Sequence, residues 1–353
     1  MPLEQSCLSV ASAEEVGIHF GNGYLFQDHD YHIGFDIYGD LYDDFPYLKY
    51  YVVPLLRRLY CVEPRVYVHP LSSTLIVRVN SSAAFKTKHE LGCPIGRKRS
   101  LRIPSAICDG PSGLLRGFAR GLFDIEGTLR FQRRGEYHCY PSLECELADP
   151  EFVMSVFIQL RQHRFPFCFR MRGFESARVN QRTKASTYTS GWHNLETWMR
   201  LVGLKNPKHL SKILIARING FCPPWTSLDE RLCIIAGELD PASFHKMNRQ
   251  ERQIESRTVA HELLVLRVCS IGRNFDQFIA AMKSRAELSE LVIRRLEKKK
   301  EISKSTENRM RTIQASELGL ERLERIFEAW TPLRQCFGIP TPASADYHPF
   351  ALV

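Results

Sequence analysis

The amino-acid sequence predicts an α+β protein with two related halves, followed by an all-helical C-terminal domain. Three observations support this prediction. A glycine-bearing apolar helix is found twice, and each copy is followed by the same order of strand-like and helical patterns. Beyond a proline-rich break at residues 221–226, strand-like alternation gives way to helical periodicity.

The clearer copy of the helix covers residues 114–128. Apolar side chains recur there at helical spacing, while Gly117 and Gly121 remove bulk from one side, so another backbone can approach closely. Gly127 ends the helix and leaves Glu126 in its last turn, where the helix dipole disfavours an anion. The carboxylate therefore needs a cation nearby, either a metal ion or a Lys or Arg side chain.

A second copy of this pattern lies upstream, at residues 15–25. In both copies a glycine stands six residues before the terminal glycine. The matched glycines are Gly17 with Gly121, and Gly23 with Gly127. The residues just before the terminal glycines are therefore also matched, and they are Asn22 and Glu126.

The patterns that follow the two helices also correspond. Strand-like alternation comes first, then an amphipathic helix, two short strands and a closing helix that ends at a glycine. In the first copy these segments are 31–37, 50–60, 65–68, 74–79 and 85–91; in the second they are 140–147, 151–163, 166–170, 185–189 and 195–202. Each copy is interpreted as helix, two strands, helix, two strands, helix, with bounds of 13–110 and 111–222.

With both copies in place, the chain resembles the single-chain LAGLIDADG homing endonucleases over residues 13–218. Three motifs carry the resemblance: residues 116–127, residues 16–23, and residues 206–213 near the end of the second copy. The resemblance implies two pseudo-symmetric αββαββα LAGLIDADG repeats in one monomeric chain. It also implies that the two glycine-bearing helices pack side by side and that the antiparallel sheets bind double-stranded DNA.

The activity implied by the resemblance is site-specific, metal-dependent cleavage of phosphodiester bonds. In this family the last acidic residues of the paired helices hold divalent ions, Mg²⁺ or Mn²⁺, and the corresponding positions here are Asn22 and Glu126. Asn22 departs from the pattern, because an amide oxygen neutralises no charge on a metal, so a slow or nicking enzyme is expected. The family also places basic residues around the metal. The candidates are Lys98 in the first copy and Lys208 or Lys212 in the second, since each follows the closing helix of its copy.

The distribution of charge indicates a polyanionic partner. The net charge is +9, but residues 1–64 carry only 3 Lys and Arg against 10 Asp and Glu, whereas residues 65–226 carry 25 against 11. Arginines on strands can reach base edges, and basic loops can hold phosphates. The candidate DNA-binding residues are Arg97, Arg99, Arg130, Arg133, Arg134, Arg170, Arg172, Arg178, Arg182 and Lys184. The plainer alternative is a solvated basic face.

Other features narrow the class of protein. The 11 cysteines include no C-x-x-C pair, which favours buried thiols over disulfides or a zinc site. No apolar run has membrane-spanning length and no signal-peptide pattern is present, so we expect no membrane partner and a cytoplasmic or organellar-matrix location. The helical C-terminal domain is expected at 227–335, with helices at 228–239, 254–268, 275–282, 288–300 and 317–330.

Three functions remain open on the sequence alone. The first is a DNA endonuclease, which Glu126 favours. The second is a non-cleaving protein on the same scaffold, either a maturase that binds intron RNA or a DNA-binding regulator, which Asn22 and the added C-terminal domain favour. The third is a basic protein whose repeats serve structure alone.

Overall fold

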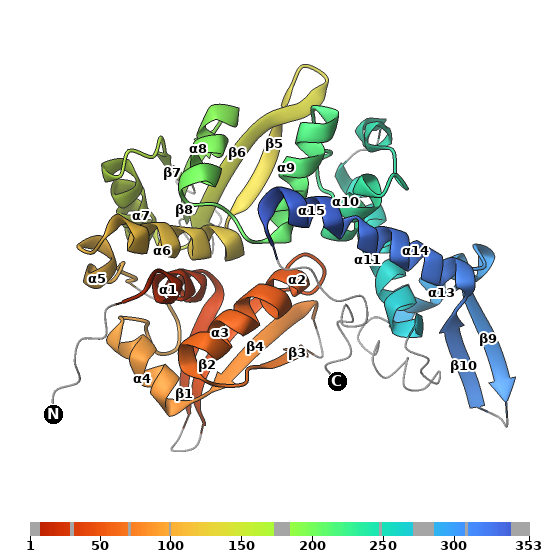
Figure 1. The fold of residues 1–353 in the computed structure, drawn as a ribbon, viewed down its shortest axis with the longest axis horizontal. Helices are drawn as coiled ribbons and strands as arrows, with labels where there is room; N and C mark the ends of the chain where they lie inside the picture. Colours follow the sequence, from red (N-terminus) through yellow and green to blue (C-terminus); the bar gives the residue numbers. More distant parts are fainter. Residues whose placement is uncertain are drawn as a thin grey trace.

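The computed structural model describes residues 8–28, 32–69, 72–98, 100–172, 184–246, 249–270, 286–307 and 310–339. Two α/β halves lie against each other, and the C-terminal region extends to one side (Figure 1). Helices α1 (Val10–Asn22) and α6 (Ser112–Ile125) lie side by side at the centre, between the two sheets (Figure 1). This arrangement confirms the predicted mixed α/β fold with antiparallel sheets.

The first half continues from α1 into a four-stranded antiparallel sheet with the strand order β1-β2-β4-β3. Its strands are β1 (Gly23–Asp28), β2 (His32–Asp40), β3 (Arg65–Val68) and β4 (Thr74–Asn80). Between β2 and β3 lie α2 (Phe45–Tyr47), a π-helical turn (Leu48–Val52) and α3 (Val53–Tyr60), and α4 (Ser82–Glu90) closes the half.

The second half has the same order of elements around α6, after the short helix α5 (Ser105–Cys108). Its strands are β5 (Thr128–Arg134), β6 (Tyr137–Leu147), β7 (Cys168–Arg172) and β8 (Lys184–Ser190), with α7 (Pro150–Gln162) before β7 and α8 (Trp192–Leu201) after β8. The strand order β5-β6-β8-β7 repeats that of the first sheet, and all neighbours are antiparallel.

The close packing of α1 on α6 depends on glycine. A Cβ atom on Gly17 would lie 2.0 Å from the carbonyl oxygen of Phe118, and one on Gly121 would lie 2.0 Å from the carbonyl oxygen of Glu14. Each glycine thus faces the backbone three residues before the matched glycine of the other helix. Only a residue without a side chain allows this approach, and the contact is reciprocal.

The C-terminal region corrects the prediction of an all-helical domain. It contains α10 (Leu228–Ile235), a 3₁₀ helix (Pro241–Lys246), α11 (Arg249–Ser270), α13 (Ala286–Lys298), α14 (Glu317–Glu328) and α15 (Trp330–Phe337), but also a β-hairpin of β9 (Ile302–Glu307) and β10 (Met310–Ala315). The hairpin buries Ile302 and Ile313 and leaves mostly polar residues between them. Such a short, polar alternation is a weak strand signal. The helix expected at 275–282 lies outside the described residues.

This C-terminal region packs against the two halves through helix α9 (Pro207–Asn219) and through the loop that follows β2. The fully buried Arg231 of α10 donates a hydrogen bond to Ser211 Oγ of α9 at 2.8 Å and lies 3.6 Å from Asp43 of the loop. The backbone N–H of Leu228 also donates to Asp43. Among the described helices, none has the length and apolar character needed to cross a membrane.

Candidate metal and nucleic-acid site

Two lysines hold the C-terminal ends of the paired helices at matched positions. Lys98 Nζ donates hydrogen bonds to the carbonyl oxygens of Gly21 and of Phe20, the latter at 3.0 Å, and Lys208 Nζ donates to that of Ile125 at 3.0 Å. Gly21 and Ile125 each directly precede the residue expected to bind metal. An ammonium group there satisfies free carbonyls and complements the negative end of the helix dipole.

Lys212, the other candidate of the second half, lies elsewhere. Its Nζ donates to the carbonyl oxygen of Leu129 on β5 at 2.9 Å, and burial lowers its pKa to about 8. Of the two alternatives that the sequence left open, Lys208 is therefore the lysine at the helix end.

Glu126 lies where the two helix ends meet. A Cβ atom on Gly21 would come within 3.3 Å of the Cβ of Glu126, so the end of α1 directly abuts this residue. Burial raises the pKa of Glu126 to about 7, although the charges of Lys98 and Lys208 oppose the shift. Within the described parts of the chain, its carboxylate has no hydrogen bond or ion pair. Glu126 is thus a shielded carboxylate whose oxygens remain available to a ligand.

The sequence reasoning missed Asp44, which positions the second lysine. Asp44 Oδ1 accepts a hydrogen bond from the Asn206 side chain at 2.8 Å and forms a 2.9 Å ion pair with Lys208 Nζ. Asp124 of α6 accepts hydrogen bonds from the backbone N–H groups of Lys205 and Asn206, both at 2.9 Å, and so faces away from Glu126. An acid in a loop of the first half therefore orients a cation of the second, a relation with no local sequence signal.

The oxygen donors at the helix ends fit one metal ion better than two. Glu126 offers an anionic oxygen and Asn22 a neutral one, while the carbonyls of Gly21 and Ile125 already accept hydrogen bonds from lysines. No group of three His, Cys, Asp or Glu residues that could hold a metal ion occurs among the described residues. Mg²⁺ commonly binds through one or two carboxylates, with substrate phosphates and water as the remaining ligands. Glu126 and Asn22 are compatible with this kind of incomplete site.

The second sheet pairs three of the predicted cations with acids. Arg130 and Arg170 both contact Glu144, the latter at 2.7 Å, and their side chains are 46% and 44% exposed while that of Glu144 is only 3% exposed. Lys184 lies 3.2 Å from Glu146. Two arginines share one carboxylate at the centre of the sheet, so the pair keeps an excess positive charge toward solvent.

The remaining predicted DNA-binding residues either lie away from the centre of the second sheet or have side chains outside the described structure. Arg133 and Arg134 are exposed at the end of β5, where the guanidinium of Arg134 lies 4.7 Å from the Tyr140 ring centre. Arg97 is exposed beside Lys98. Arg172 lies on β7, but its side chain is outside the described structure, as are the residues Arg99, Arg178 and Arg182.

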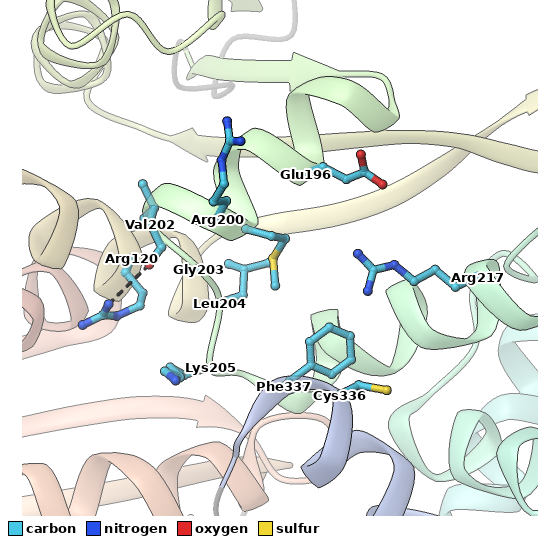
Figure 2. A pocket seen from close by; sticks show the side chains of 11 residues that line it. Arg120, Glu196, Arg200, Val202, Gly203, Leu204, Lys205, Arg217, Cys336 and Phe337 are labelled. Carbon is cyan, nitrogen blue, oxygen red and sulfur yellow. Dashed lines mark hydrogen bonds between the residues drawn. The ribbon is translucent and has the colours of Figure 1, made fainter.

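A separate pocket of about 510 Å³ lies among α6, α8, α9 and α15 (Figure 2). Arg217 reaches into it and lies 5.9 Å from the ring centre of Phe337, whereas Arg200 extends away from it (Figure 2). Arg120 is held by the carbonyl oxygen of Val202 and by Glu14. None of the metal-site residues lines this pocket, so its basic side chains are distinct from the helix-end site.

No protein-family model and no curated protein matches the chain. Several solved structures match part of it. Mesophilic variants of the homing endonuclease I-DmoI share 12% sequence identity, with a TM-score of 0.38 over 55% of this chain and 96% of theirs. The homing endonuclease I-WcaI bound to its DNA recognition sequence shares 14%, with a TM-score of 0.36 over 57% of this chain and 88% of that one.

Proposed function

We propose that the chain is a LAGLIDADG-type DNA endonuclease that binds a specific double-stranded site and nicks it. In this proposal residues 13–110 and 111–222 are pseudo-symmetric repeats, and residues 227–335 form an added C-terminal domain. The observation that carries the proposal is Glu126, a shielded carboxylate without a hydrogen bond or ion pair to any described residue, which lies at the junction of two glycine-packed helices and close to two lysines. The resemblance of the motifs at residues 16–23, 116–127 and 206–213 to those of the LAGLIDADG endonucleases supports the same function.

Each residue of the site has a chemical role in this proposal. Glu126 and Asn22 hold one Mg²⁺ or Mn²⁺ ion, which when bound supplies positive charge to the phosphate and lowers the pKa of bound water. Lys98 and Lys208 add positive charge at the same place, where the reacting phosphate becomes more negative. Arg130, Arg170 and Lys184 of the second sheet hold the duplex through phosphates and base edges.

The difference between Asn22 and Glu126 determines the expected product. Since only one of the two helix ends supplies an anion, the site would hold a single metal ion and would favour cleavage of one strand. We therefore expect nicked DNA to form in large excess over double-strand breaks.

A non-cleaving protein is the second candidate, and it would act as an intron RNA maturase or a DNA-binding regulator. The observation in its favour is the donor set, because Asn22 offers a neutral amide in place of an acid and no group of three His, Cys, Asp or Glu residues that could hold a metal ion occurs among the described residues. A raised pKa near 7 also leaves Glu126 partly protonated at neutral pH, which weakens metal binding.

The two candidates differ in a plasmid assay. A supercoiled plasmid library carrying candidate sites is incubated with wild type, Glu126→Gln or Glu196→Gln, in Mg²⁺, Mn²⁺ or EDTA. Glu196 lines the separate helical pocket, so its variant loses one carboxylate without touching the site. We expect metal-dependent nicking by wild type and Glu196→Gln, and a loss of about 10³-fold or more in Glu126→Gln with DNA affinity retained.

A different result would support the non-cleaving candidate. If wild type binds a selected duplex but cuts neither strand in Mg²⁺ or Mn²⁺, and Asn22→Asp does not restore cutting, the nuclease proposal is wrong. Selection of bound sequences from random duplex DNA and from RNA would then separate a regulator from a maturase.

A further inference from the structure

The pocket among α6, α8, α9 and α15 has a lining rich in cations, and the proposed cleavage gives these cations no role (Figure 2). Its volume of about 510 Å³ lies within the range of about 300–1,000 Å³ that is typical of small-molecule sites. We refer to it as the basic pocket, and the charged residues that line it are Arg120, Glu196, Arg200, Lys205 and Arg217. The basic pocket therefore has the size of a ligand site and a surplus of positive charge.

Two of these cations are available to a ligand. Arg120 is already held, because it donates to the carbonyl oxygen of Val202 at 3.3 Å and pairs with Glu14. Lys205 and Arg217 form no ion pair within the described parts of the chain, and they lie on opposite sides of the basic pocket in Figure 2. Two cations that face one pocket without a paired acid raise its positive potential and attract an anion.

The backbone that carries Lys205 is fixed before any ligand arrives. Asp124 of α6 accepts hydrogen bonds from the backbone N–H groups of Lys205 and Asn206, both at 2.9 Å. The hydrogen bond from Arg120 to Val202 holds the other end of the same short segment, which joins α8 to α9. A site whose backbone is already held in place loses less conformational entropy on binding.

The rest of the lining suits an apolar body with a flat ring. Phe337 of α15 is half-buried, and the guanidinium of Arg217 lies 5.9 Å from its ring centre. Met199, Val202 and Leu204 supply the other apolar groups of the lining. Because an aromatic side chain packs well against another ring, Phe337 can hold a flat group while Arg217 beside it holds a charge.

A phosphate monoester matches the charge of this lining. Glu196 and Arg200, four residues apart on α8, offset each other at the rim, so that Lys205 and Arg217 leave two positive charges. A phosphate monoester carries about −1.5 to −2 at pH 7, and its oxygens accept strong hydrogen bonds from arginine and lysine. A monocarboxylate would leave one cation without a counter-charge, and inorganic phosphate would leave the apolar part of the basic pocket unfilled.

We propose that the basic pocket binds a small organic phosphate that carries a flat ring. Lys205 and Arg217 hold the phosphate, and Phe337 packs against the ring. This inference does not depend on the proposed cleavage, because none of the metal-site residues lines the basic pocket. Arg217 belongs to α9 and Phe337 to α15, so the ligand also links the C-terminal region to the second half.

Isothermal titration calorimetry of the full chain tests this inference, with AMP as the probe. Adenosine has the ring without the charge, inorganic phosphate has the charge without the ring, and succinate is a dianion without a ring. We expect AMP to bind at least about tenfold more tightly than each of the other three, because it alone combines both features. The proposal is wrong if AMP does not bind, or if inorganic phosphate or succinate binds as tightly as AMP does.

Variants locate the probe within the molecule. Arg217→Ala and Lys205→Ala should each weaken AMP binding about 10- to 100-fold, the effect of losing one charge-assisted hydrogen bond. Phe337→Ala should weaken it about 2- to 10-fold, whereas Phe337→Tyr keeps a ring and should bind as wild type does. Arg200→Ala is the matched control, since its side chain extends away from the basic pocket and its loss should change AMP affinity by less than about threefold (Figure 2). Equal losses in Arg200→Ala and Arg217→Ala would contradict the proposal.

Cys336 provides a second test within the wild-type protein. Its exposed thiol lines the basic pocket, while the exposed thiol of Cys61 lies at the end of α3 in the first half. Mass spectrometry after alkylation with iodoacetamide should show that AMP slows the reaction of Cys336 several-fold and leaves that of Cys61 unchanged. This measurement decides the question if a variant fails to fold. Should saturating AMP leave the alkylation of Cys336 unchanged, AMP binds elsewhere and the proposal is wrong.

Discussion

The two halves of the molecule share a backbone plan but place different chemistry on matched positions. At the helix ends the first half has Asn22 where the second has Glu126. At the centre of the sheets, Asp36 pairs with a single arginine set between two rings, whereas Glu144 is contacted by two arginines. The difference teaches that topology constrains only part of each half, so that matched positions of the two sheets can carry different chemistry.

The helices that join the halves differ in the same way. Glu14 and Glu15 of α1 are buried, and they correspond to Phe118 and Ala119 of α6. Glu15 is held by an ion pair with the buried Lys88 at 2.5 Å and by a hydrogen bond from Tyr60 at 2.8 Å. Buried ion pairs contribute little net stability but tolerate loss of one partner poorly. The first half is thus held by a polar network where the second uses apolar packing.

The largest expected effect tests what the halves share. Gly17→Ala and Gly121→Ala should each lower the free energy of unfolding by about 3 kcal/mol, because a Cβ at either position would lie 2.0 Å from a carbonyl oxygen of the opposite helix. Gly113→Ala is the matched control: its Cβ would lie 3.4 Å from a Val10 methyl carbon, an ordinary contact distance, and alanine favours helix by up to about 1 kcal/mol. Urea unfolding measures all three. Unequal losses of unfolding free energy at the two matched glycines would contradict the prediction that the contact is reciprocal.

The second-largest expected effect tests how the two sheets differ in the number of arginines that pair with their central acid. Arg78→Ala removes the arginine that pairs with the buried Asp36 and should cost about 2 kcal/mol of folding stability. Arg130→Ala should cost less than about 0.5 kcal/mol, because Arg170 still pairs with Glu144. The double variant Asp36→Asn/Arg78→Ala removes the unpaired charge and should recover part of the loss. Equal destabilisation by the two arginine variants in urea unfolding would contradict this asymmetry.

A smaller effect comes from making the helix ends alike. Asn22→Asp supplies the first half with the anion that Glu126 gives the second, so it should raise the linear fraction of plasmid about tenfold relative to the nicked fraction. Without metal, the second carboxylate is repelled by Glu126 and by both helix dipoles, so the variant should be less stable in EDTA than in Mg²⁺. An unchanged ratio of linear to nicked product would mean that position 22 does not control the second strand.

Much of the fold could be predicted because its signals are local. Gly17 and Gly121 each lie within an apolar helical pattern, six residues before its terminal glycine, and so indicate two helices that can pack closely. Period-two alternation indicates the strands of both sheets. The hairpin β9–β10 was missed because few of its residues are apolar, so its alternation is hard to distinguish from that of a loop.

The candidate site was harder to predict because its geometry depends on contacts between distant segments. Lys208 and Lys212 both follow the second closing helix, and only the way α9 packs decides which reaches Ile125. That packing depends on Asp44, from a loop more than 150 residues earlier in the chain. The cluster of rings on the exposed face of the first sheet, formed by Tyr24, Phe26, Tyr38 and Tyr67, also escaped prediction, since these residues come from three different strands and gather only when the sheet forms.

The smallest expected effect follows from the raised pKa of Glu126. The unfolded chain releases this proton near the ordinary glutamate pKa of about 4.5, whereas burial holds it in the folded, metal-free protein until about pH 7. Between these values the folded state binds more protons, so the contribution of Glu126 to stability falls as pH rises through this window and stays level above it. Solvent access and the nearby lysines limit the change to about 1 kcal/mol.

The glutamine variant isolates this contribution from all other titrating groups. The difference in unfolding free energy between wild type and Glu126→Gln in EDTA should move by about 1 kcal/mol in favour of the variant from pH 5 to pH 8, because glutamine never ionises. At pH 8, adding Mg²⁺ should stabilise wild type but not Glu126→Gln, since only the carboxylate attracts the ion. Asn22→Gln provides the comparison with the first half and should show no such pH dependence. A difference that stays constant from pH 5 to pH 8 would mean that Glu126 ionises as freely as an exposed glutamate, and that the helix ends do not shield it.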